Sequence, residues 1–195
     1  MLLTGIGGQG VQLCAKALAM AATAEGRQAM LSAHYGGEMR GGQTEASVVV
    51  ADAGLRALPI LPWAGSAYVM HAAWWPPVRD RLRPGAVVVA NSTVVEGSLF
   101  ADESAEGGAD VRVFMVPAAA MAAEAGAPMT AGFVLLGAYA GVTGLVSGDS
   151  LVEAMKELVP PYRRQHVEAN EAAIRSGVAA VPSGAASLWA QATVS

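Results

Sequence analysis

The first segment whose residue types suggest chemistry is the glycine-rich run Gly5-Ile-Gly-Gly-Gln-Gly10. It stands between a short apolar stretch and a helical pattern. Nucleotide-binding loops have this layout, because glycines permit a tight turn and let backbone N–H groups approach a phosphate. The pattern predicts a cofactor-binding loop formed by Gly7, Gly8, Gln9 and Gly10.

Two features that accompany such loops in nucleotide-binding proteins are missing from the sequence. A dinucleotide fingerprint needs an acid about 20 residues further on, at the end of the second strand, where it binds the ribose. The expected second strand ends near residues 32–34, which include no Asp or Glu. The Gly-Lys-Ser/Thr of a Walker loop is absent as well. The glycines are therefore equally consistent with close packing of a helix on a strand.

A second glycine-rich segment, His34-Tyr-Gly-Gly-Glu-Met-Arg-Gly-Gly42, places one carboxylate and one guanidinium in a frame that is costly to order. Glu38 and Arg40 could pair with each other, bind an anionic ligand or dock a partner chain, and a solvated loop is the plain alternative. We expect the following residues to form an interface or a ligand-facing loop: Tyr35, Glu38, Met39, Arg40, Gly41 and Gly42.

The remaining reactive side chains predict no catalytic residue and no metal site. Cys14 is the single cysteine and lies on the apolar side of the first helical pattern, so we expect a small core residue. Without a Cys-x-x-Cys motif the chain cannot hold an iron–sulfur cluster by itself. The three histidines are scattered, which disfavours a metal centre, and we expect His71 to be a half-buried structural residue.

The elements that must position these loops alternate along the chain between strand and helix patterns. This alternation predicts an α/β fold, a Rossmann-like three-layer domain with a mostly parallel sheet and a helical C-terminal part. We expect strands at 2–4, 28–32, 44–50, 67–71, 86–90 and 111–116, and helices at 10–25, 76–82, 117–125, 130–142, 150–159 and 162–176. We also expect a turn at Pro84-Gly85, a capping box from Ser150 to Glu153, and a helix stop at Gly177.

Composition limits the class of protein. The chain has 195 residues, 53% of them hydrophobic and only 14% charged, with a net charge of −4. These values predict one globular domain and exclude the basic footprint of a nucleic-acid-binding protein. No apolar run resembles a membrane span and the first residues do not resemble a signal peptide, so we expect a cytoplasmic protein. So little charge also indicates that much of the surface faces another protein.

Taken together, Gly5-Ile-Gly-Gly-Gln-Gly-Val11 and Tyr35-Gly-Gly-Glu-Met-Arg-Gly-Gly42 resemble the gamma subunit of the 2-oxoacid:ferredoxin oxidoreductases. Leu136-Gly-Ala138 and Asn170-x-x-Ala-x-x-x-Gly177 match the same family, and the resemblance covers roughly residues 2–180. One departure is Ala131-Gly132, where the family often has an asparagine.

The resemblance implies a subunit that does not act alone. Such complexes convert a 2-oxoacid and coenzyme A into acyl-CoA and carbon dioxide, and pass two electrons to ferredoxin or a similar acceptor. It implies thiamine diphosphate, Mg²⁺ and [4Fe-4S] clusters on the alpha, beta and delta subunits, with this chain as scaffold. It also implies that the loop from Tyr35 to Gly42 lies at a subunit interface or on the coenzyme A side of the complex. It also implies a gamma-type domain over residues 1–180, and we expect an extended tail at 181–195.

A second hypothesis is a stand-alone NAD(P)-binding reductase of the Rossmann type. The missing ribose acid and the second glycine segment favour the gamma subunit. The substrate stays open among pyruvate, 2-oxoglutarate, branched-chain and aryl oxoacids such as phenylglyoxylate, because the resemblance implies that partner chains select it.

Overall fold

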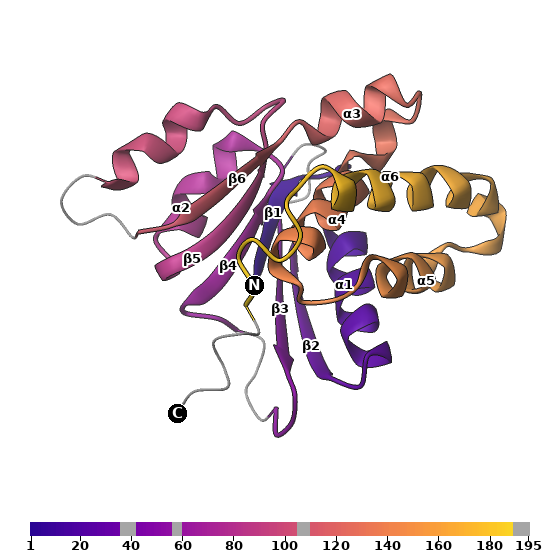
Figure 1. Cartoon of the computed structure of the whole chain (residues 1–195), viewed down its shortest axis with the longest axis horizontal. Coiled ribbons are helices and arrows are strands. Elements are labelled where there is room, and N and C mark those ends of the chain that lie inside the picture. The colour runs from indigo at the N-terminus through magenta and orange to yellow at the C-terminus, as the bar shows by residue number, and fades with distance from the viewer. Residues whose placement is uncertain (36–41, 56–59, 105–109, 189–195) are drawn as a thin grey trace.

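A six-stranded sheet forms the centre of the computed structural model, which describes residues 1–35, 42–55, 60–104 and 110–188 (Figure 1). The strands are β1 (Leu2–Ile6), β2 (Gln28–Tyr35), β3 (Gln43–Ala51), β4 (Ala64–Val69), β5 (Leu82–Asn91) and β6 (Arg112–Val116). Their order across the sheet is β2-β3-β1-β4-β5-β6, and β3 runs antiparallel to both of its neighbours. The other pairings are parallel. The predicted α/β class with a mostly parallel sheet is confirmed.

Helices cover both faces of the sheet, as a three-layer fold requires (Figure 1). One face carries α1 (Val11–Ala24), α3 (Ala118–Glu124) and α4 (Ala131–Thr143), with α5 (Gly148–Leu158) and α6 (Val167–Ala179) packed outside α1 and α4. The other face carries α2 (Trp75–Arg79) and the 3-10 segments η1 (Ala72–Trp74) and η2 (Gly97–Ser104). Alternate strand residues divide between the two cores: Leu3 packs with α1 and α4, and Leu2 packs with α2.

Helix α4 is buried along its whole length, which explains its all-round apolar sequence. Its outer side touches α6 at backbone distance. A Cβ added to Gly177 would overlap the carbonyl group of Val134 and lie 2.9 Å from the amide nitrogen of Ala138. The prediction that Gly177 ends the last helix is therefore wrong: α6 continues to Ala179, and the glycine is needed because only a hydrogen atom fits against α4.

The expected capping box at Ser150 is displaced by three residues. Ser147 is the residue that caps α5: its hydroxyl oxygen accepts a hydrogen bond of 3.0 Å from the backbone N–H of Ser150. The helix therefore begins at Gly148, and Ser150 lies in its first turn with its hydroxyl 2.9 Å from that of Ser147. Several small polar residues in succession, each able to cap a helix, hid the true start from sequence inspection.

The expected turn at Pro84-Gly85 lies inside β5. Ala64 pairs with Leu82 but Ser66 pairs with Val87, so the register against β4 shifts between these two pairs. The surplus residues form an irregular bulge, for which Gly85 supplies a backbone φ of 78°. The strand thus begins before the proline and glycine that we expected to separate it from the preceding helix.

The described part of the expected tail, residues 181–188, turns back over the end of α4. Backbone N–H groups of Gly184 and Ala186 donate to the carbonyl oxygens of Gly141 and Val142, at 2.7 and 3.0 Å. These bonds satisfy carbonyl groups that the C-terminus of a helix otherwise leaves without partners. Residues 189–195 lie outside the described part of the chain.

Candidate functional site

The two glycine loops meet at the carboxyl end of β1. The backbone N–H of Gly7 donates to the carbonyl oxygen of Gly42 at 2.9 Å, and Ile6 pairs with Gln43 in the sheet. Tyr35 lies at the end of β2, where its backbone pairs with Thr44. Glu38, Met39, Arg40 and Gly41 lie outside the described residues. The structure thus joins the first loop to the end of the second, although the sequence separates them.

Within the first loop, Gln9 closes the turn. The side-chain oxygen of Gln9 accepts a hydrogen bond of 2.9 Å from the backbone N–H of Ile6. The backbone N–H of Gln9 in turn donates to the carbonyl oxygen of Ile6 at 3.1 Å. Gly8 and Gly10 have backbone φ values of 101° and 74°, which favour glycine. The amide of Gln9 therefore shapes the loop, and the two positive φ values explain two of its glycines.

The first loop is also packed against the start of α4. A Cβ at Gly132 would lie 2.7 Å from the backbone oxygen of Gln9, and one at Gly5 would lie 2.6 Å from the Gln9 side chain. The hydroxyl of Tyr68 on β4 donates to the carbonyl of Gly132 at 3.0 Å. The alternative that these glycines allow close packing is therefore supported at Gly5, where a side chain would collide with Gln9. At Gly132, contact with the first glycine loop leaves no room for a side chain.

Strand order argues against dinucleotide binding at this loop. In dinucleotide-binding folds the second strand lies beside the first, so that its terminal acid reaches the ribose. Here β3 separates β2 from β1, which places β2 about 10 Å away at two strand spacings. Strand β2 itself carries neither Asp nor Glu. Within the described residues of β2, no acid is present to complete a nucleotide site with Gly7 and Gly10.

At the carboxyl edge of the sheet, the chain leaves the neighbouring parallel strands β1 and β4 toward opposite faces: α1 follows β1 on one face and η1 follows β4 on the other. Ligands of α/β proteins commonly bind at such a point. His71, which follows β4, is half-buried and uses Nδ1 to accept the backbone N–H of Ala73 at 3.2 Å. The structural role expected for His71 is therefore confirmed.

Asn91 and Thr93, at the end of β5, were missed by sequence inspection. Asn91 is buried, and its Oδ1 accepts the backbone N–H of Ala119 at 3.2 Å, while the Thr93 hydroxyl accepts that of Ala120 at 3.1 Å. They hold the start of α3, whose N-cap residue, Pro117, makes no side-chain cap. The sequence signal that could have identified these two residues was a polar residue directly after the apolar run of β5.

Cys14 is a core residue, as predicted. Its side chain is 1% exposed and its sulfur lies 3.8 Å from the hydroxyl of Tyr68. Burial raises the pKa of the Cys14 thiol to about 12, so the thiolate that a nucleophile or a metal ligand requires is disfavoured. Among the residues that the structure describes, no group of three or more His, Cys, Asp or Glu side chains is placed to hold a metal ion.

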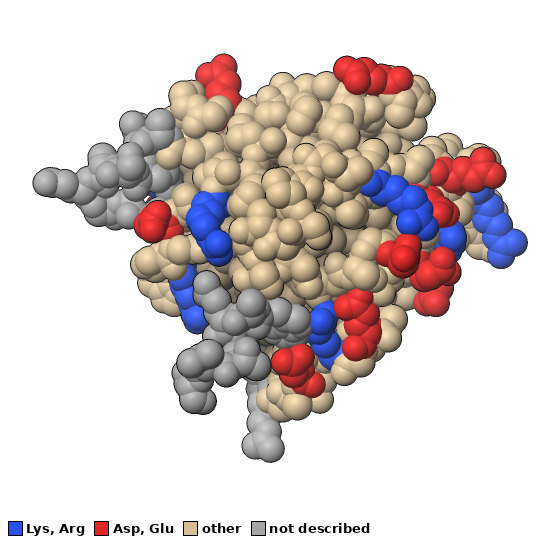
Figure 2. All heavy atoms as spheres, in the orientation of Figure 1, with Lys and Arg blue, Asp and Glu red and all other residues tan. Residues whose placement is uncertain are grey.

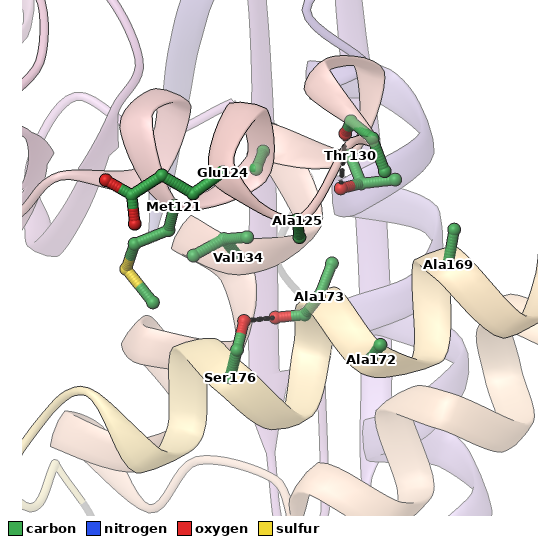
Figure 3. A pocket seen from close by; sticks show the side chains of 11 residues that line it. Met121, Glu124, Ala125, Thr130, Val134, Ala169, Ala172, Ala173 and Ser176 are labelled. Carbon is green, nitrogen blue, oxygen red and sulfur yellow. Dashed lines mark hydrogen bonds between the residues drawn. The ribbon is translucent and has the colours of Figure 1, made fainter.

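A groove of about 400 Å³ lies between α3, α4 and α6 (Figure 3). Alanines form much of its lining, and its hydroxyl groups are already used: Ser176 donates to the carbonyl of Ala173 at 2.9 Å, and Thr130 donates to that of Ala127 at 2.8 Å. Glu124 is the ionisable residue of the lining. In Figure 2, few charged side chains lie over the middle of the molecular face that is in view. The groove offers apolar contact area without an acid–base or nucleophile pair.

Within the described part of the chain, no helix combines the length and the apolar character needed to cross a membrane.

Taken together, the candidate site consists of the glycine loops at the carboxyl edge of the sheet and of the apolar surface over the helices.

Comparison with known proteins gives a consistent result. Residues 1–180 match the model of the family described as pyruvate ferredoxin/flavodoxin oxidoreductase. The chain is 34% identical over 161 residues to the 2-oxoglutarate synthase subunit KorC of Methanothermobacter thermautotrophicus, covering 82% of this chain and 84% of the relative. It is 32% identical over 157 residues to the pyruvate synthase subunit PorC of the same organism, covering 80% and 82%.

Among solved structures, the chain resembles the gamma subunit of the keto/oxoacid ferredoxin oxidoreductase of Geobacter sulfurreducens. The TM-score is 0.72 at 24% identity, over 91% of this chain and 95% of that one. This structural likeness supports the fold, and the match over 180 residues supports the family. The chain therefore belongs to the pyruvate ferredoxin/flavodoxin oxidoreductase family.

Proposed function

We propose that this chain is the gamma subunit of a 2-oxoacid:acceptor oxidoreductase complex that depends on thiamine diphosphate and iron–sulfur clusters. The complex would convert a 2-oxoacid and coenzyme A into acyl-CoA and carbon dioxide, and pass two electrons to ferredoxin or a similar acceptor. The observation that carries the proposal is the similarity, over four fifths of both chains, to named subunits of 2-oxoglutarate synthase and pyruvate synthase.

The cofactors would be held by partner subunits. Thiamine diphosphate would supply the carbanion chemistry on the alpha and beta chains, with Mg²⁺, and the [4Fe-4S] clusters would carry electrons through them and the ferredoxin-like delta chain. An iron–sulfur cluster needs several cysteine thiolates, whereas this chain has one cysteine whose thiol is buried. The donor set of this chain therefore does not fit a cluster.

The contribution of this chain would be to shape and support the active site of its partners. The hydrogen bond between Gly7 and Gly42 joins the two glycine loops at one edge of the sheet, so both could meet the same partner surface. We propose that Gly7, Gly8, Gln9, Gly10 and Gly42, with the second-loop residues before it, lie at a subunit interface or beside coenzyme A. Residues 1–180 would form the gamma-type domain and residues 181–195 its C-terminal tail, which the extent of the family match supports.

Reconstitution tests the proposed function. The chain is expressed alone, and also together with its thiamine-binding and ferredoxin-like partners, and each preparation is assayed for coenzyme-A-dependent reduction of a viologen dye by 2-oxoacids. We expect turnover from the complex, loss of most of it when this chain is omitted, and neither turnover nor thiamine diphosphate binding from the chain alone. Turnover by the isolated chain would refute the proposal.

Arg40 tests the second loop. We expect Arg40→Ala to leave the chain folded, because a loop arginine contributes little to a core, but to weaken the complex. Loss of an arginine that is paired with a carboxylate at a desolvated interface typically costs about 2–5 kcal/mol, because the partner charge stays buried. A role in assembly would reduce co-purification of partner chains, and a role in coenzyme A binding would raise the coenzyme A KM of an intact complex. Wild-type assembly and turnover would show that the loop is only a solvated turn.

A further inference from the structure

A second and larger groove, of about 820 Å³, lies beside the 3-10 segment η4 (Pro161–His166). We call it the η4 groove and define it by Leu13, Met129, Phe133, Tyr162, Arg163 and His166, which come from four elements of the chain. Phe133 is buried in the lining, while η4 contributes both the ring of Tyr162 and the basic side chains Arg163 and His166. None of the groove residues belongs to the glycine loops.

The η4 groove exposes large apolar side chains. Met129 is 84% exposed and Tyr162 is 74% exposed, the two highest values among the large hydrophobic residues that the structure describes. Tyrosine, methionine and arginine are enriched where proteins meet, whereas lysine, aspartate and glutamate are depleted there. The groove lining contains the first three residue types and none of the last three. Its composition is that of a protein interface.

The charge of the η4 groove is opposite to that of the chain. The chain has a net charge of −4, yet no Asp or Glu lines the groove and Arg163 does. The Arg163 guanidinium lies over the Tyr162 ring, 5.6 Å from its centroid. Other arginines, such as Arg81 and Arg175, form ion pairs with carboxylates of this chain. In the described residues no carboxylate pairs with Arg163, so the groove presents a positive charge to an incoming chain.

We propose that the η4 groove docks a segment of a partner subunit in which an apolar side chain is flanked by Asp or Glu carboxylates. The proposal rests on the proposed function, because that function supplies the partner subunit. The apolar side chain would lie between Met129, Phe133 and Tyr162, and a carboxylate would meet the planar guanidinium of Arg163, which suits two parallel hydrogen bonds. Burial of Met129 and Tyr162 supplies contact area, and the charge of Arg163 selects the sign of the partner's charge.

Asn170 adds a buried polar group to the groove wall. It is 8% exposed, and its side-chain N–H makes a long contact of 3.7 Å to the sulfur of Met155. Because such a contact to a thioether is weak, the amide keeps hydrogen-bonding capacity for the backbone of a docked segment. The groove thus combines an apolar floor, a cation and a buried amide within reach of one peptide.

Photocrosslinking in the assembled complex tests where the segment binds. A photoreactive benzoylphenylalanine replaces Tyr162, which is exposed and therefore dispensable for the core, and a second complex carries the same group at Lys16, an exposed position on α1. We expect the first complex to yield a crosslinked partner peptide with an apolar residue between Asp or Glu residues. Absence of a partner crosslink from position 162, or a crosslink to a peptide without carboxylates, would overturn the proposal.

Charge reversal tests the energetic role of the groove. We expect Arg163→Glu to raise the dissociation constant of this chain from its partners by about tenfold or more, as loss of an interface arginine commonly does. Met129→Ser should weaken assembly as well, and added salt should reduce the difference between Arg163→Glu and wild type. Lys16→Glu, which also reverses an exposed positive charge, is the control and should assemble like wild type.

The outcomes distinguish failure of the docking-site proposal from failure of the proposed function. If the wild-type chain co-purifies with no thiamine-binding partner, the proposed function fails and the docking site fails with it. If the wild-type complex forms and turns over, and Arg163→Glu and Met129→Ser bind as tightly as Lys16→Glu, the function stands and the docking site is wrong. Far-ultraviolet circular dichroism of each variant chain confirms that any lost assembly reflects the surface and not unfolding.

Discussion

Replacing Gly177 by alanine should destabilise the domain, although alanine is the better helix former. Gly177 lies inside α6 and faces α4 at backbone distance. An added Cβ would lie 2.8 Å from the carbonyl carbon of Val134 and 2.9 Å from the amide nitrogen of Ala138, and would overlap the Val134 carbonyl oxygen. These obstructing atoms belong to the backbone of a helix that is held between the sheet and α6, so they cannot turn aside.

Two opposing terms set the size of the effect. The change from glycine to alanine in a helix interior favours folding by about 1 kcal/mol. Forcing an extra carbon into a packed core costs about 1–3 kcal/mol and occasionally more, and backbone obstruction places this site at the upper end. The net loss should therefore be about 2 kcal/mol. For a domain of this size that loss lowers Tm by about 4–8 °C.

Thermal unfolding followed by circular dichroism measures this loss, and two other glycines provide a graded control. At Gly141 a Cβ would meet the end of the Val181 side chain at 2.8 Å, which can move, so Gly141→Ala should cost less than Gly177→Ala. At Gly65 a Cβ would meet nothing within 4 Å, so Gly65→Ala should leave Tm nearly unchanged. A Gly177→Ala variant as stable as wild type would show that α4 and α6 do not approach as closely as described.

Three other predictions concern the α5 cap, Cys14 and the first loop. Ser147→Ala should cost about 1 kcal/mol of unfolding free energy because it removes the cap of α5, and Ser150→Ala should cost less; urea unfolding compares them. The unfolded Cys14 thiol ionises near pH 9 and the folded one near 12, so stability should fall above pH 9, by about 1.4 kcal/mol per pH unit from this thiol. Cys14→Ala should reduce that slope in urea unfolding at pH 8 and pH 10, and an unchanged slope would contradict the assignment. NAD(H) should show no micromolar binding to the chain in calorimetry, and such binding, if abolished by Gly7→Val, would restore the reductase hypothesis.

Sequence periodicity predicted the helices and strands well where hydrophobic burial alone determined the structure. The all-round apolar pattern of residues 130–142 indicated a buried helix, and α4 is buried throughout. Local signals failed where a tertiary contact overrode them. Gly177 has the residue type of a helix stop but is required by contact with α4, and Pro84-Gly85 has the type of a turn but forms a bulge in β5. A short motif does not reveal which neighbour a glycine will face.

The candidate site was predictable in composition but not in geometry. Both glycine loops stand out in the sequence, yet the hydrogen bond from Gly7 to Gly42 depends on β3 pairing with β1, a long-range antiparallel register. That same register separates β2 from β1, whereas the two strands are neighbours in dinucleotide-binding folds. The basic and apolar lining near Arg163 was not noticed, because its members come from distant segments and each is unremarkable alone.

The burial of α4 has a consequence for biosynthesis. Helix α4 precedes α6 in the chain, and until α6 docks, the outer side of α4 around Val134 and Ala138 has the sheet behind it and water in front. Exposed apolar surface of this kind is what makes incomplete chains aggregate. A nascent chain in which α6 has not yet docked on α4 therefore still carries this aggregation-prone surface.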